Sequence, residues 1–183
     1  MTHSAILMET AMNRRTMFAL LTMCAGLTLG CSDRLAQMQT QLAGKWELDS
    51  RTLPDGTVLR KPEVSGVFSW QPIDSRKAHV TLNMLVNSGG EKPRTFDFAA
   101  SKYEISTSAI TRSRYLLIRQ GYRSSFDAPI TVYHKAKVEK GKITLEDGLI
   151  RITHERGYSE EFRGDQMVAS FPDVFVDNWK RVR

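Results

Sequence analysis

The feature that most constrains the fold is an alternation of apolar and polar residues that begins at Gly44 and returns along most of the chain. In residues 45–49, tryptophan and leucine alternate with charged residues. A period of two puts successive side chains on opposite faces of a strand, so each such segment predicts a strand buried on one face. The chain therefore predicts an all-β domain of about nine or ten strands. The same alternation recurs at 78–86, 96–98, 132–138, 143–145 and 150–152.

Glycines separate these segments where antiparallel hairpins turn. Asp55-Gly56, Lys140-Gly141, Asp147-Gly148 and the triplet at 88–90 each offer a glycine for positive φ. Links of two residues cannot join parallel strands, which need a long crossover. The C-terminal half at least is therefore predicted to be an antiparallel meander. We expect an up-and-down barrel, because closure leaves no sheet edge exposed; a β-sandwich is the alternative.

Residues 1–30 predict an export signal rather than part of the fold. An arginine pair at 14–15 precedes an uncharged, mostly apolar run over 17–29, which is shorter than the ~20 residues of a membrane-spanning helix. The residues before position 12 carry no lysine or arginine, so translation starts at either Met1 or Met12.

The apolar run ends in Leu-Thr-Leu-Gly-Cys, with Gly30 directly before Cys31. A small residue before a cysteine at this point resembles the lipobox of bacterial lipoproteins. The resemblance implies cleavage between Gly30 and Cys31 and a lipid such as palmitate on Cys31, which anchors the protein in a membrane. Ser32 follows where an aspartate commonly retains such proteins in the inner membrane. The expected location is therefore the cell envelope, at the outer membrane facing the periplasm.

The mature domain is predicted to contain no thiol. Of the two cysteines, cleavage removes Cys24 and acylation uses Cys31, so neither a disulfide nor a cysteine metal site can form. The net charge of +6 is dispersed along the chain, and an envelope location argues against a nucleic-acid partner.

Three segments follow from these observations. Residues 1–30 form the signal peptide, 31–43 the lipidated cysteine with a tether and short helix, and 44–183 the barrel domain. The helix is predicted because apolar residues recur at helical spacing on one face. These residues are Leu35, Met38 and Leu42.

The start and end of the domain resemble the lipocalin-like (calycin) barrels. Their first strand typically opens with Gly-x-Trp soon after a short helix, as Gly44 and Trp46 do here. A closing strand in that family often brings a basic residue over this tryptophan. The resemblance implies that Trp179 lies on the closing strand and that Arg181, or alternatively Arg183, stacks on Trp46 and closes one end of the barrel.

Two histidines and two phenylalanines are candidate lumen residues. His134 and His154 share their strand faces with aliphatic residues, so both are predicted to point inward, where they could bind a ligand or simply be hydrogen-bonded. Spacing reveals no third ligand, so no metal is predicted. Phe96 and Phe98 could line a cavity or fill the core. A basic stripe could meet a carboxylate or phosphate head group, or lie on a solvated face: Arg112, Arg114, Arg119 and Arg123.

The sequence contains no Gly-x-Ser-x-Gly elbow, phosphate-binding glycine loop or HExxH motif. We therefore expect a protein that is not an enzyme and uses no cofactor. The resemblance implies a membrane-anchored lipocalin-like lipoprotein that binds or carries a small hydrophobic or amphiphilic ligand in the envelope. The alternative is a structural or interaction lipoprotein whose barrel is packed solid and holds no ligand.

Overall fold

A computed structural model describes residues 33–87, 95–121, 130–134 and 137–183, so the predicted signal peptide, Gly30 and Cys31 lie outside the described residues. A short helix covers residues 33–42. The strands are β1 (Gly44–Thr52), β2 (Val58–Leu59), β3 (Val64–Pro72), β4 (Lys77–Val86), β5 (Thr95–Ile105), β6 (Ala109–Gln120), β7 (Thr131–Tyr133), β8 (Lys137–Glu146), β9 (Leu149–His154), β10 (Ser159–Arg163), β11 (Gln166–Phe171) and β12 (Phe175–Val182).

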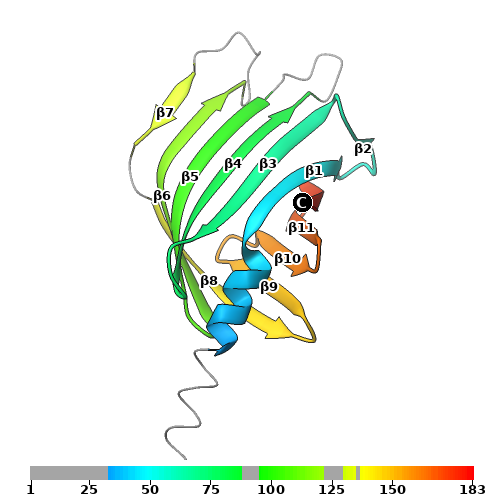
Figure 1. The fold of residues 1–183 in the computed structure, drawn as a ribbon. Coiled ribbons are helices and arrows are strands. Elements are labelled where there is room, and N and C mark those ends of the chain that lie inside the picture. The colour runs from blue at the N-terminus through cyan, green and yellow to red at the C-terminus, as the bar shows by residue number, and fades with distance from the viewer. Residues whose placement is uncertain (1–32, 88–94, 122–129, 135–136) are drawn as a thin grey trace, which may run out of the picture.

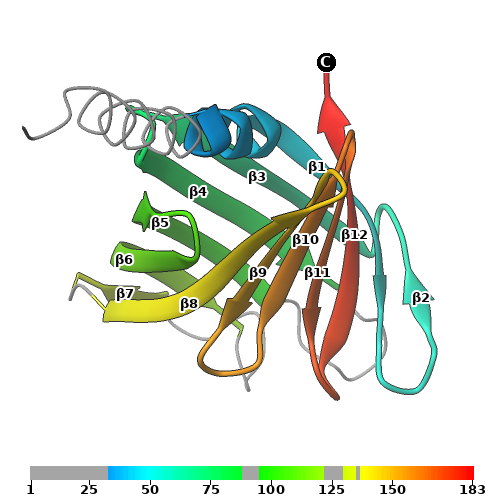
Figure 2. The same ribbon diagram turned by 90° about the horizontal axis from the view of Figure 1, so that it is seen from below.

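The strands form the predicted antiparallel up-and-down barrel (Figures 1 and 2). Ten of them close the ring in the order β1-β3-β4-β5-β6-β8-β9-β10-β11-β12, and β12 pairs with β1. The pairs Trp46↔Arg181 and Leu48↔Trp179 belong to this closing ladder. The two short strands, β2 and β7, pair with β1 and β6 outside the ring. Barrel closure rules out the sandwich.

The helix closes one end of the barrel, as Figure 2 shows. Its predicted apolar face is buried: Met38 and Leu42 are fully covered and Leu35 nearly so. Gln39 joins the helix to the barrel, because its amide oxygen accepts a hydrogen bond of 2.8 Å from the indole nitrogen of Trp70. We call this the closed end. We call the opposite end, where β4 finishes and β5 begins, the open end.

The core fills the closed half with large side chains. Trp46, Trp70 and Phe162 are at most 1% exposed, and the rings of Trp46 and Phe162 meet edge to face at 5.4 Å. All the buried hydrophobic residues described lie between Leu35 and Trp179. Residues 32–183 contain all of the core described here and the β1–β12 closing ladder, so we expect them to fold as one unit.

Of the two predicted glycine turns in the C-terminal half, one is a hairpin and the other is not. Asp147 and Gly148 have φ values of 48° and 74° and connect β8 to β9. The Lys140-Gly141 turn is wrong, because β8 runs through Gly141 without interruption. A Cβ atom at Gly141 would lie 2.6 Å from the carbonyl oxygen of Thr153 and 3.1 Å from a methyl carbon of Ile110. Close packing, not a turn, requires this glycine.

We expect Gly141→Ala to lower the free energy of unfolding by about 1–3 kcal/mol, because the new methyl group meets backbone that cannot move aside freely. Urea denaturation measures this. Gly148→Ala is the matched control: nothing lies within 4 Å of its Cβ position, so its cost comes from the positive φ of 74° alone. An unchanged unfolding midpoint for Gly141→Ala would contradict the packing argument.

In the described part of the chain, no helix has the length and apolar character needed to cross a membrane.

Candidate functional site

The interior of the barrel is charged toward its open end. For part of the sheet, the strand face that the sequence predicted to be inside is therefore the outer face. Met84 on β4 packs against the core and pairs with Asp97 on β5, which in turn pairs with Arg119 on β6. Side chains of paired residues share a face, so Asp97 and Arg119 point inward. Their ion pair is 2.7 Å long. Phe96 and Phe98 therefore lie on the outer face and do not line the lumen.

Four residues on β6 and β8 form the centre of this charged interior, and we call them the lumen charge cluster: Arg112, Arg114, Lys137 and Glu139. The ladder pairs Arg112 with Glu139 and Arg114 with Lys137. Arg112 donates a short hydrogen bond to the Glu139 carboxylate. Lys137 Nζ lies 2.8 Å from the same carboxylate and Arg114 Nη2 lies 3.8 Å from it. One carboxylate is thus shared by three cations.

The cluster keeps Glu139 ionised. Burial alone would raise the pKa of this carboxyl, but hydrogen bonds from Lys137 and Arg112 lower it to about 2. Arg114 is destabilised in its charged form, because burial and the neighbouring positive charge of Arg112 both lower its pKa. The Nε atoms of Arg112 and Arg114 are buried and have no hydrogen-bond partner. The cluster therefore has more positive charge and more donors than its one carboxylate uses.

A buried ion pair joins the two closing strands, β1 and β12. Arg51 on β1 donates two hydrogen bonds of 2.6 Å to the carboxylate of Asp177 on β12. The guanidinium of Arg51 also lies 4.1 Å from the ring centre of Phe175. Burial raises the pKa of Asp177, although Arg51 opposes this shift. The pair links the two strands that complete the ring.

His154 is buried inside the barrel, as predicted, but His134 is not its partner. His154 stacks on Tyr158 at 5.4 Å, and its Nε2 lies 3.7 Å from the Oε2 of Glu160. That distance exceeds a hydrogen bond, and neither atom has another partner. His134 follows β7 and is exposed. It lies on the same face as Val132, which pairs with Ile118 on β6. Ile118 in turn pairs with Phe98, and both point outward. The prediction of two inward histidines is wrong for His134.

The predicted barrel-closing stack is present. The guanidinium of Arg181 lies 4.3 Å from the ring centre of Trp46. It also donates hydrogen bonds to the carbonyl oxygens of Gln41, in the last turn of the helix, and of Ala43, just after it. Gly44 has φ of 130°, and a Cβ atom there would lie 3.1 Å from Arg181. Arg181, rather than Arg183, therefore forms the contact, and Trp179 is buried beside it.

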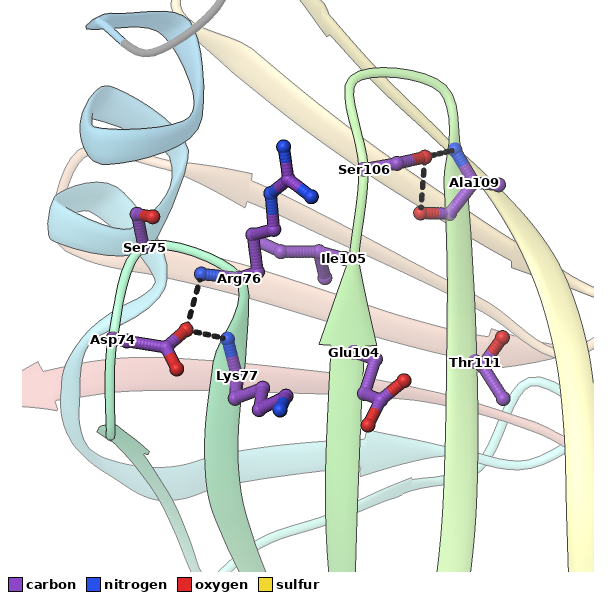
Figure 3. Close-up of a pocket in the computed structure, with 9 residues that line it drawn as sticks. All are labelled: Asp74, Ser75, Arg76, Lys77, Glu104, Ile105, Ser106, Ala109 and Thr111. Atoms are coloured by element: carbon purple, nitrogen blue, oxygen red, sulfur yellow. Dashed lines mark hydrogen bonds between the residues drawn. The ribbon is translucent and has the colours of Figure 1, made fainter.

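A shallow hollow lies on the surface near the closed end, between the β3–β4 and β5–β6 turns (Figure 3). Its polar groups hold these turns together. The Asp74 carboxylate accepts hydrogen bonds from the backbone N–H groups of Arg76 and Lys77, and the Ser106 hydroxyl bonds the N–H and carbonyl of Ala109. These hydrogen bonds stabilise the two turns and explain the polar groups that line the hollow. The lumen charge cluster is therefore the stronger candidate site.

Among the residues that the structure covers, no three histidine, cysteine, aspartate or glutamate side chains are grouped to hold a metal. No family model, curated protein or solved structure matches the chain.

Sequence reasoning missed the acidic half of the interior. Asp97, Glu139, Glu160 and Asp177 all point inward, and Glu160 and Asp177 are almost fully buried. A signal existed for Glu160, since it shares a strand face with Phe162, whose ring is fully buried. For Asp97 and Glu139 the alternation pointed the wrong way, because their apolar neighbours are the residues on the outer face.

Proposed function

We propose that the protein is a membrane-anchored lipocalin-like lipoprotein that binds or carries a small hydrophobic or amphiphilic molecule in the cell envelope, without catalysis. Cys31 carries the lipid anchor, and the barrel holds the ligand on the periplasmic side of the outer membrane. The all-β barrel is compatible with this role.

The observation that carries the proposal is the difference between the two halves of the lumen. Near the helix, the inward aromatic and aliphatic side chains are almost fully buried. Toward the open end, the inward residues of β4 remain partly accessible, and Figure 1 shows β4 and β5 extending beyond β9–β11. Partly exposed apolar side chains beside a few convergent polar groups are typical of ligand sites. The residues of β4 concerned are Leu82, Met84 and Val86.

Native mass spectrometry of residues 32–183, purified without detergent from an envelope extract, tests ligand binding. We expect a second mass series heavier than the polypeptide, which organic extraction removes. A bare polypeptide mass after incubation with envelope lipid extract would overturn the carrier proposal and favour the structural lipoprotein, for which the solid packing of the closed half is the supporting observation.

The anchor has its own test. Cells that express the full chain are labelled with a clickable palmitate analogue, and we expect label on the wild-type protein and none on Cys31→Ala. Cys24→Ala is the matched control and should keep the label. Equal labelling of wild type and Cys31→Ala would contradict the assignment of Cys31.

A further inference from the structure

We propose that a free strand edge near the open end binds an extended segment of another protein, in which apolar and acidic residues alternate, as an added β-strand. We call it the open-end edge; it consists of β7, residues 131–133, and the start of β8, residues 137–139. The proposal goes beyond the carrier function and requires no ligand in the lumen. Three features carry it: unpaired backbone groups, exposed valines on the outer face and excess positive charge.

The open-end edge has no neighbouring strand among the described residues. β7 pairs only with β6. β9 pairs with β8 only over residues 141–146, because the chain turns after His154 toward β10. Figure 1 shows β7 at the open end, beyond β9 and β10, and Figure 2 shows β8 diverging from β9. In the described part of the chain, residues 137–139 therefore have β6 on one side and no strand on the other.

The backbone of Val138 points to this free side. The carbonyl oxygen of Lys140 accepts a hydrogen bond from the N–H of Glu155, which follows β9, whereas the N–H of Ile143 donates to Ser108, which precedes β6. Backbone groups of alternate residues point to opposite sides of a strand. Val138, two residues from Lys140, therefore directs its N–H and C=O away from β6. Free groups of this kind are a template for a strand of another chain.

The outer face of the open-end edge is apolar. Val132 and Val138 are 44% and 59% exposed, and each pairs with an outward residue of β6. Native proteins often protect such an edge with a proline, but none of the described residues on this edge is a proline. An added strand with β-branched residues on its outer face would cover both valines through cross-strand contacts.

The charges at the edge favour an acidic partner. Lys137 lies on the inner face with 42% of its side chain exposed, and it shares the Glu139 carboxylate with Arg112 and Arg114. Lys140, just past the edge, is exposed and has no ion-pair partner among the described residues. Acidic side chains on the inner face of an added strand would supply the missing negative charge.

A second copy of this chain fits the edge less well than another protein. Antiparallel pairing of the edge with itself reverses the strand direction, so the closed ends of the two barrels would point in opposite directions. If Cys31 holds the closed end at the bilayer, two copies in one membrane cannot meet in this way. The open-end edge would then lie away from the membrane, where another protein can reach it.

Fluorescence anisotropy of residues 32–183 with a labelled short peptide, in which glutamate and valine alternate, tests the proposal. We expect saturable binding. The same peptide with lysine in place of glutamate should bind at least about tenfold more weakly, because it meets a positive edge. Failure of the acidic peptide to bind, or equal binding of both peptides, would overturn the proposal.

Two N-methylated forms of the acidic peptide test the backbone pairing. One is methylated on the valine nitrogens and the other on the glutamate nitrogens, so both have the same charge and side chains. Only one set of N–H groups faces the protein, because alternate residues of a strand point to opposite sides. We expect one form to bind at least about tenfold more weakly and the other to bind nearly as the parent. Equal effects of the two methylations would overturn strand addition, whether or not any variant folds.

Val138→Pro removes the N–H that faces the free side and leaves the groups that face β6. Proline is tolerated at such an edge position. We expect this variant to weaken the acidic peptide at least about tenfold, and Val138→Thr, which keeps the N–H and the branched side chain, to weaken it clearly less. Circular dichroism checks that both variants fold. Unchanged binding by folded Val138→Pro would contradict the assignment of the edge.

Sedimentation of the wild-type domain without peptide tests the second copy as the occupant. We expect a monomer. A dimer that Val138→Pro converts to a monomer would assign the edge to a second copy and overturn the proposal. The carrier function does not depend on these results, because native mass spectrometry tests it separately.

Discussion

Replacing Arg51 with alanine is expected to lower the free energy of unfolding by about 3–5 kcal/mol, because it leaves the Asp177 carboxylate buried without its partner. Asp177 is 2% exposed, and both of its carboxylate oxygens accept hydrogen bonds of 2.6 Å from Arg51. The same substitution removes the cation over the Phe175 ring. Chemical denaturation followed by tryptophan fluorescence measures the loss.

The double variant Arg51→Ala with Asp177→Ala separates the buried charge from the lost packing. It should recover part of the stability lost by Arg51→Ala, since no unpaired carboxylate remains inside the barrel. A surface pair gives the scale for comparison: Lys180→Ala breaks an exposed contact with Asp49 and should change stability by at most about 1 kcal/mol. If Arg51→Ala costs no more than Lys180→Ala, the ion pair does not hold the closing strands.

Trp46→Ala is expected to cost about 3–5 kcal/mol as well, for a different reason. The indole is fully buried, its ring meets Phe162 edge to face at 5.4 Å, and its Nε1 donates a hydrogen bond of 3.3 Å to the carbonyl oxygen of Leu42. Truncation leaves a cavity where the helix, the first strand and the last strand meet. Thermal and urea unfolding measure the loss.

Arg181→Met shows how much of this cost belongs to the stack. It removes the cation over Trp46 and its hydrogen bonds to the end of the helix while it keeps an apolar chain of similar length. We expect a loss clearly smaller than that of Trp46→Ala. A larger loss would mean that the arginine, not the tryptophan, carries the closure.

The sequence was informative wherever one physical cause decides the local structure. Helical spacing of Leu35, Met38 and Leu42 identified the helix, since an apolar stripe must be buried. Period two identified the strands. The resemblance at Trp46 and Arg181 correctly implied the closing stack, which depends on two residues at the ends of the domain.

Alternation could not say which face of a strand is inside. It marks two unlike faces, and the apolar one is normally buried, so Phe96 and Phe98 were candidate lumen residues. In this barrel the charged residue between them, Asp97, faces inward instead and pairs with Arg119 on the adjacent strand. This ion pair between β5 and β6 joins residues 22 positions apart, and such a pairing is absent from any local pattern. The candidate site was hidden for this reason.

If Cys31 carries the proposed lipid anchor, the helix at the closed end determines which way the barrel faces. Asp33, its first described residue, is two positions after Cys31, a stretch of chain that spans at most about 7 Å. If Cys31 carries the proposed lipid, the closed end rests against the bilayer and the entrance to the lumen looks into the aqueous space. The molecule then stands on its closed end, with the open end away from the membrane. It could not take a ligand directly from the leaflet beneath it. Ligand would enter and leave through the open end, on the side away from the membrane.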